Sequence, residues 1–406
     1  MKILFLTENF PPETNAAATR VFERALYWVS AGHHVTVITC VPNFPQGALF
    51  EDYQNRWHQT EDMAGIKVVR VKTYISANRG VVRRSLDFLS FGFMGFIAGL
   101  FQPRPDIVAA TSPQFFAAVA GWAIAACRRL PFIFELGDLW PTSIAAVGAI
   151  KKGLLLSMVE KFELFLYRRS ARVAALTHAF KKNLISRGID PNKIDVVLNG
   201  VDLPRYAPQA RDQALAKEWQ LQDKFVIGYV GTHGMAHGLS NVLDAAEKLK
   251  DNDHIHFLLA GAGAERDMLL ESAKKRELSN IVFMPMQPKE KMPAVWSLCD
   301  VALVHLKDNP AFAEVIPSKI FEAMAMGLPI LLAVPDGEAR GIMEDHAAGL
   351  WVPPGNPDAL ASAAEKISTN KDLYRQLAAS SLAAAAKHSR TVQADEMIAV
   401  FEKAVS

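Results

Sequence analysis

Cysteine is scarce in this sequence and follows no pattern. The 406 residues contain 3 cysteines, far apart at Cys40, Cys127 and Cys299. A disulfide framework needs cysteines that can pair, so a small disulfide-bonded scaffold is excluded. We expect all three to be buried thiols in a reducing compartment.

Metal-ligand clusters are also lacking. Asp251-Asn252-Asp253 repeats an acid-x-acid pattern that holds a metal in some enzymes. It lies in a polar stretch between a predicted helix and strand, so a solvated turn explains it better. The sequence therefore offers no metal site.

Apolar runs long enough to cross a bilayer, about 20 residues, are missing. The charge-free run 88–101 spans 14 residues and is flanked by Arg83, Arg84 and Arg104. It predicts either a helix at a membrane surface or a core helix, and both remain open. The apolar start of the chain is too short for a signal peptide, so we expect a cytoplasmic protein.

Charge is balanced overall but not along the chain. The net charge is +2, yet residues 1–200 carry 23 Lys and Arg against 15 Asp and Glu. The remaining residues carry 21 against 27. A basic first half favours an anionic partner there, and we expect the membrane surface, with no nucleic-acid partner.

Alternating strands and helices predict an α/β protein with two doubly wound parallel-sheet domains. A turn-rich segment at 199–208 suggests the boundary. We expect domains at 1–203 and 204–387, with a last helix at about 388–406 that packs back on the first, and a ligand cleft between the domains. The loop 8–18 after the first strand has no glycine, which counts against a dehydrogenase. The predicted strands are 2–7, 35–39, 67–71, 106–111, 131–135, 171–176, 194–198, 225–230, 256–259, 281–283, 301–304 and 330–333.

The segment 314–327, E-V-I-P-S-K-I-F-E-A-M-A-M-G, is the strongest candidate site. Pro317 and Ser318 predict a helix start, so Lys319 and the first-turn amides would face an anion such as phosphate. Glu314 and Glu322, on either side, would accept hydrogen bonds from sugar hydroxyls. The alternative is two unrelated glutamates, of which Glu322 is a solvated helix residue.

Two further stretches follow predicted strands. Glycines in the segment 231–238, G-T-H-G-M-A-H-G, would let the backbone approach a ligand, with His233 or His237 as donors; a flexible turn is the alternative. Gly261-Ala262-Gly263 fits a tight turn. In the segment 134–141, F-E-L-G-D-L-W-P, Asp138 and Glu135 are acid/base candidates and Trp140 a stacking wall; helix caps are the alternative.

Together these motifs resemble retaining glycosyltransferase family 4, whose members have the two-domain GT-B fold. The resemblance covers the full length, and Glu314-x7-Glu322 is that family's hallmark. Within it, the chain most resembles bacterial N-acetyl-fucosamine transferases of O-antigen and capsule synthesis. The other motifs that carry the resemblance are Phe10-Pro11-Pro12-Glu13, the segment 32–38, the segment 42–47, Asp138-Leu139-Trp140-Pro141, Asn199-Gly200-Val201-Asp202 and Pro317-Ser318-Lys319.

The resemblance implies a metal-independent enzyme with no tightly bound cofactor, which transfers a sugar from a UDP-sugar to a polyprenyl-diphosphate-linked saccharide. Glu322 would bind the ribose and Glu314 the donor sugar, with Lys319 and Asp138 as the other catalytic candidates. The expected diphosphate-binding and base-binding residues are Ile316, Pro317, Ser318, Gly231, Thr232, His233, Gly234, His237 and Met284.

The chain departs from the family at three positions. Thr232 and His237 stand where many members have Arg and Lys, and Gly137 stands where many have His. Lys319 and backbone amides would then have to offset more of the negative charge of the diphosphate, and a protein general base becomes doubtful. A sugar-nucleotide 2-epimerase and a non-catalytic nucleotide-sugar-binding protein remain alternatives.

Overall fold

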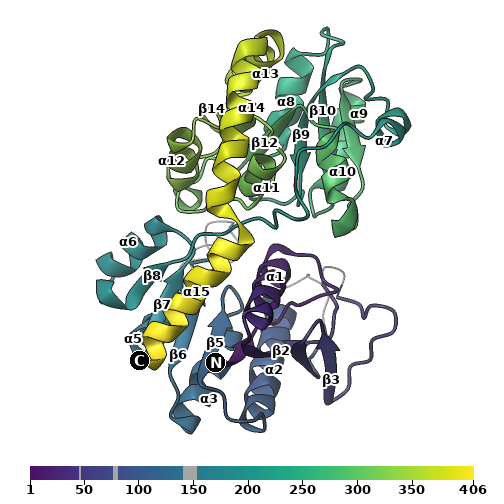
Figure 1. Ribbon diagram of the computed structural model, residues 1–406. Coiled ribbons are helices and arrows are strands. Elements are labelled where there is room, and N and C mark those ends of the chain that lie inside the picture. Colours follow the sequence, from purple (N-terminus) through teal and green to yellow (C-terminus); the bar gives the residue numbers. More distant parts are fainter. Residues whose placement is uncertain (45–46, 76–80, 140–152) are drawn as a thin grey trace. The chain divides into compact units, whose positions relative to one another are not determined.

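The computed structural model describes residues 1–44, 47–75, 81–139 and 153–406. The described chain divides into two compact units, Met1–Asn199 with Arg390–Ser406, and Gly200–Ser389 (Figure 1). Unit 1 and unit 2 are used below for these two parts. Each is built on its own β-sheet, as the α/β prediction required.

The sheet of unit 1 has 8 strands in the order β3-β4-β2-β1-β5-β6-β7-β8. All described pairs are parallel except β3 with β4. β5 and β6 are buried along their whole length because helices cover both faces of the sheet. The strands are β1 (Lys2–Leu6), β2 (His34–Cys40), β3 (His58–Met63), β4 (Ile66–Val71), β5 (Ile107–Thr111), β6 (Phe132–Leu136), β7 (Arg172–Ala175) and β8 (Ile194–Val196).

The helices of unit 1 form two layers. α1 and the C-terminal α15 pack on each other, and the indole of Trp28 donates to the Ala394 carbonyl oxygen at 3.0 Å. Trp28 also packs edge-on against Phe401. The layer of α2, α3 and α5 contacts the sheet separately. The helices are α1 (Ala16–Ser30), α2 (Val81–Leu100), α3 (Phe115–Arg128), α5 (Leu154–Arg169), α6 (His178–Ser186) and α15 (Arg390–Val405).

The run 88–101 falls in α2, which is buried on one face and exposed on the other. Phe91 is fully buried, and a Cβ added at Gly92 would lie 2.9 Å from Phe116 Cβ on α3. Phe93 and Phe101 are exposed. None of the helices in the described part of the chain combines the length and apolar character that a membrane span requires.

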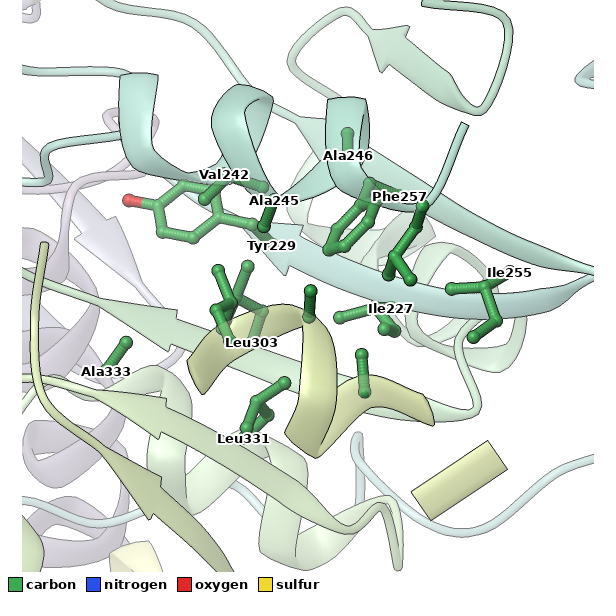
Figure 2. Packing of buried hydrophobic residues seen from close by; sticks show 14 of the residues in the cluster. Ile227, Tyr229, Val242, Ala245, Ala246, Ile255, Phe257, Leu303, Leu331 and Ala333 are labelled. Atoms are coloured by element: carbon green, nitrogen blue, oxygen red, sulfur yellow. The ribbon is translucent and has the colours of Figure 1, made fainter. Parts of the chain in front are cut away.

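Unit 2 has a 6-stranded parallel sheet in the order β11-β10-β9-β12-β13-β14. Figure 2 shows its core, where Ile227 and Tyr229 of β9 pack with Leu303 and with Val242 of α8. The strands are β9 (Phe225–Val230), β10 (Ile255–Ala260), β11 (Ile281–Met284), β12 (Val301–His305), β13 (Ile330–Ala333) and β14 (Gly349–Val352). The helices are α7 (Gln213–Glu218), α8 (Ser240–Lys248), α9 (Arg266–Lys275), α10 (Met292–Ser297), α11 (Lys319–Ala325), α12 (Glu338–Asp345), α13 (Pro357–Thr369) and α14 (Lys371–Ala385).

The prediction of three buried thiols is wrong for one cysteine. Cys40 and Cys299 are buried, whereas Cys127 is exposed. Cys127 lies in the last turn of α3, on the side that faces away from the sheet, so its apolar neighbours in sequence do not bury it.

Candidate functional site

Lys319 opens α11 and is buried, with only 9% of its surface exposed. The Ile320 amide donates to the Pro317 carbonyl oxygen at 3.1 Å, so the first turn starts at Pro317 as predicted. Ser318, however, does not cap the helix with its side chain. It already has helical dihedral angles, φ −58° and ψ −26°, whereas a capping serine is extended.

The Lys319 ammonium has no hydrogen-bond partner among the described residues. It lies 3.4 Å from the centre of the Tyr229 ring, and a Cβ added at Gly231 would lie 3.0 Å from Nζ. Burial lowers the pKa of Lys319 to about 7, and nearby Glu322 opposes the shift only in part. A buried cation without a counter-charge is costly, so this position suits an anionic ligand.

The glycine-rich segment 231–238 follows β9, and backbone hydrogen bonds connect its start to residues 260–262, at the end of β10 and just after it. The Gly231 amide donates to the Ala260 carbonyl oxygen and the His233 amide to the Ala262 carbonyl oxygen, both at 2.9 Å. A Cβ at Gly261 would overlap the Gly231 carbonyl oxygen, and one at Gly263 the His233 carbonyl oxygen. The two glycines therefore let two backbone segments meet, beyond the tight turn that was predicted.

Two histidines of this segment have ring nitrogens without partners in the described chain. His233 is fully buried and neither of its ring nitrogens is bonded, and His237 Nδ1 is also unbonded. Burial, together with the positive charge of Lys319, lowers the pKa of His233 to about 4 and that of His237 to about 3. Both are therefore neutral at neutral pH, and each can donate one ring N–H to a ligand.

His305, at the end of β12, was missed by the sequence analysis. Its Nδ1 lies 2.6 Å from the His237 carbonyl oxygen, and its Nε2 lies 2.9 Å from Asn241 Nδ2. Burial lowers its pKa to about 4, so it is neutral, with the proton on Nδ1. His305 therefore fixes the end of the glycine-rich segment. The sequence signal that could have identified His305 was a histidine at the carboxyl end of an apolar strand.

The two glutamates of the predicted motif lie in different settings. Glu322, one turn into α11, accepts a hydrogen bond from Trp296 Nε1 of α10 at 3.0 Å. Glu314 is half-buried in the segment before α11, as are Ile316 and Pro317. Trp296 was not predicted, because its role depends on α10 packing beside α11.

The structure joins some of the predicted residues by direct contacts but not all. Lys319, Gly231, His233 and His237 surround Tyr229. Thr232 is exposed, and its carbonyl oxygen accepts from the Tyr229 hydroxyl at 2.8 Å, whereas Gly234 is half-buried. Met284, the expected base contact, is fully buried, and its carbonyl oxygen accepts a hydrogen bond from the Gly261 amide at 3.0 Å.

In unit 1, Glu135 is an internal ion-pair residue, and the acid/base interpretation of it is wrong. It is 1% exposed and bonds the guanidinium groups of Arg20 and Arg24 at 3.0 and 2.8 Å. Burial works against its charge, but the two arginines hold the pKa of Glu135 below its usual value. A carboxylate bonded in this way has no access to a substrate proton.

Asp138 lies half-buried after β6, and its amide and carbonyl both contact the Ser112 hydroxyl at 3.3 Å. Gly137 has no room for a larger residue, since a Cβ would lie 2.6 Å from the Ser112 carbonyl oxygen and 3.0 Å from Arg20 Nη2. A larger residue at Gly137 would therefore require Ser112 or Arg20 to move. Trp140, the proposed stacking wall, lies outside the described residues.

The acid-x-acid pattern at 251–253 is a surface turn. Asp253 is exposed and pairs with Lys224 Nζ at 2.7 Å. Within the described ranges, no group of His, Cys, Asp and Glu is arranged to hold a metal ion.

Comparison with known proteins relates both parts of this chain to glycosyltransferases. Residues 15–200 match the glycosyl transferase 4-like domain, and residues 211–382 match the glycosyl transferases group 1 family. WcaI of Escherichia coli, described as a colanic acid biosynthesis glycosyl transferase, is 27% identical over 80% of this chain and 82% of its own. A GDP-mannose-dependent alpha-mannosyltransferase of Mycobacterium tuberculosis is 26% identical over 89% of this chain and 87% of its own.

Solved structures show the same fold. Anabaena HepE in complex with UDP superposes with a TM-score of 0.72 at 19% identity, covering 98% of both chains. Sucrose-phosphate synthase of Thermosynechococcus elongatus superposes with a TM-score of 0.79 at 16% identity, covering 99% of this chain and 98% of its own. These neighbours and the two domain matches agree: both parts of the chain match glycosyltransferase domains, and the chain has the GT-B fold.

Proposed function

We propose that this glycosyltransferase is a retaining enzyme that moves a sugar, an N-acetylated amino sugar, from a UDP-sugar to a lipid-linked saccharide in O-antigen or capsule synthesis. The observation that carries the donor assignment is the buried Lys319 ammonium, unpaired among the described residues, beside Gly231. Its missing counter-charge fits a nucleoside diphosphate.

The donor diphosphate binds where three kinds of groups meet. Lys319 supplies the charge, His233 and His237 supply ring N–H donors, and Gly231, which has no side chain, lets the Lys319 ammonium approach the backbone. Glu322 binds the ribose hydroxyls, and Glu314 binds the donor sugar. The UDP and UDP-glucose complexes of Anabaena HepE support this choice of donor by their likeness in fold.

Chemically, the bond between the anomeric carbon and the diphosphate oxygen breaks, and the acceptor oxygen attacks on the same face. Because attack and departure use the same face, the anomeric configuration is retained. The acceptor proton passes to the departing phosphate, so no protein base is needed. Lys319 stabilises the negative charge that develops on the leaving group. Asp138, at the carboxyl end of β6, orients the acceptor. The positive side chains stand in for a metal ion, and no tightly bound cofactor takes part.

The acceptor is a saccharide on a polyprenyl diphosphate, and the enzyme acts at the inner face of the cell membrane. The basic first half of the chain and the exposed apolar residues of α2 support this placement. Relatives named for colanic acid biosynthesis support the pathway class.

A donor screen followed by product analysis tests the proposal. We expect UDP-sugars to raise the melting temperature and one of them to be transferred to a synthetic polyprenyl-diphosphate saccharide. NMR of the product should show the anomeric configuration of the donor. Inverted configuration would refute the mechanism. If Lys319→Met and Glu322→Ala both still bind the donor as the wild type does, the site assignment is refuted.

A further inference from the structure

The layer of α2, α3 and α5 covers one face of the sheet in unit 1. α2 packs on β2 and β4, α3 on β1, β5 and β6, and α5 on β6. Leu6 and Ile38 point toward α2 near Gly95, whereas their strand neighbours Phe5 and Val37 belong to the core with α1 and α15. Alternate residues of a strand face opposite sides, so the outer surface of this layer faces away from the sheet.

A groove opens between the C-terminal halves of α3 and α5. Its volume is about 360 Å³, which lies within the range of small-molecule sites. Its lining includes Trp122 and Ala126 of α3, Phe165 of α5 and Phe132 of β6. The rings of Trp122 and Phe165 meet edge-on with centroids 5.2 Å apart, so they form one continuous aromatic surface. The lining of the groove is therefore mostly apolar.

The rim of the groove is positively charged. The Arg169 guanidinium lines the opening and lies 5.6 Å from the centre of the Phe165 ring. Arg168 and Arg129 are exposed close by in sequence, and neither forms an ion pair with a described residue. Basic residues at helix C-termini are favoured by the helix dipole, but the dipole does not explain an apolar groove below them.

Acidic residues do not neutralise this face. Residues 81–104, 115–130 and 154–169 contain 8 Lys and Arg against 3 Asp and Glu. Asp87 and Glu163 are buried, and Glu160 pairs with Arg187 at 3.0 Å. The outer face of the layer therefore attracts anions.

Exposed apolar residues continue the same surface along α2. Leu86, Leu89, Phe93 and Leu100 recur at the spacing of one helix face and are 47%, 50%, 63% and 37% exposed. Phe101, directly after the helix, is 83% exposed. Apolar side chains among arginines are typical of a surface that lies on an anionic membrane.

We infer that the groove between α3 and α5 binds one hydrocarbon chain of an anionic phospholipid, whose phosphate pairs with Arg168 and Arg169. The hydrocarbon chain occupies the apolar interior beside the paired rings of Trp122 and Phe165, and the charged rim holds the headgroup at the surface. This inference deepens the proposed membrane attachment by naming the lipid class and its site. It is independent of donor binding, which involves unit 2 alone.

Filling the groove tests the inference. Ala126→Phe places a ring in the groove, and Cys127→Phe adds the same ring at the neighbouring exposed position outside the lining. We expect the wild type to bind phosphatidylglycerol vesicles and not phosphatidylcholine vesicles. Ala126→Phe should weaken that binding about tenfold, a loss of about 1.4 kcal/mol, and Cys127→Phe should leave it unchanged. Equal binding by the two variants would overturn the inference.

A second measurement detects the hydrocarbon chain of the lipid in the groove. Phosphatidylglycerol brominated along its acyl chains should quench the tryptophan fluorescence of the wild type, and Trp122→Phe should remove most of that quenching. Quenching that persists in Trp122→Phe, or a wild type that ignores anionic vesicles, would also overturn the inference. A cooperative thermal melt and an unchanged circular dichroism spectrum of each variant show that unit 1 is folded. If the wild type fails to bind UDP, the donor site is wrong and the lipid result still stands.

Discussion

Replacing Lys319 by methionine should make the protein more stable and at the same time unable to bind its donor. Methionine keeps the apolar side chain beside Tyr229 but removes the buried charge. The pKa of Lys319 falls from 10.5 to about 7 because burial disfavours the charged form. A structural lysine would stabilise the fold, whereas a ligand-binding lysine with no counter-charge destabilises the free protein.

The size of the effect follows from the pKa. A fall from 10.5 to about 7 corresponds to a free-energy cost of about 5 kcal/mol. We therefore expect Lys319→Met to be more stable than the wild type by about 5 kcal/mol at pH 6. For a unit of this size, that gain raises the melting temperature by roughly 10–20 °C.

The effect should depend on pH in a defined direction. Below the folded-state pKa of about 7 both states carry the proton, and the full cost is present. Between about 7 and 10.5 only the unfolded state binds the proton, so wild-type stability rises by about 1.4 kcal/mol per pH unit relative to the variant. The advantage of Lys319→Met should therefore fall to about 2 kcal/mol at pH 9 and disappear near pH 10.5.

Thermal melts at pH 6 and pH 9, with and without UDP, measure both effects. UDP at a hundred times its dissociation constant should stabilise the wild type by about 2.7 kcal/mol and leave Lys319→Met unchanged. Lys366→Met, at an exposed position of α13, is the matched control and should behave as wild type. A Lys319→Met variant less stable than wild type at pH 6, or one that still responds to UDP, would refute the reasoning.

Three other substitutions test the surroundings of Lys319. Glu322→Ala should weaken UDP binding about tenfold, measured by calorimetry, with transfer falling in proportion; unchanged affinity would exclude the ribose contact. His305→Phe should loosen the glycine-rich segment and lower the affinity for UDP without a large loss in melting temperature, because it removes the bond to the His237 carbonyl oxygen. Gly261→Ala should push the segment out of place, since its Cβ would overlap the Gly231 carbonyl oxygen. Gly341→Ala, where a Cβ meets no atom within 4 Å, is its control.

Local sequence predicted the buried strands well. β9 (Phe225–Val230) and β13 (Ile330–Ala333) have the predicted bounds, because each is a short apolar run ended by a turn or charged segment. β3 (His58–Met63) was missed, since its six residues are mostly polar and its strand conformation depends on pairing with β4 at the sheet edge. β14 (Gly349–Val352) was missed because its three apolar residues lie between Gly349 and the pair Pro353-Pro354, which indicate a loop, and its strand conformation depends on pairing with β13.

The motif residues of the site were found from sequence, but their partners were not. Lys319 and the glycine-rich segment stand out by composition and by their place at strand and helix ends. Tyr229 looks like any strand residue, and its contact with Lys319 arises only when β9 lies beside the start of α11. The acid/base prediction for Glu135 failed because a carboxylate at a strand end can face either a ligand or an arginine. Its arginine partners lie more than 100 positions away in sequence, so local sequence does not reveal them.

Proton uptake on UDP binding tests most directly whether Lys319 is the diphosphate-binding cation. At pH 8 a lysine with a pKa of about 7 is mostly neutral, and a bound diphosphate should restore its charge. Calorimetry at pH 8 in buffers of different ionisation enthalpy should show that the wild type takes up nearly one proton on binding UDP. UDP binding without proton uptake would show that Lys319 does not meet the diphosphate and would contradict the account.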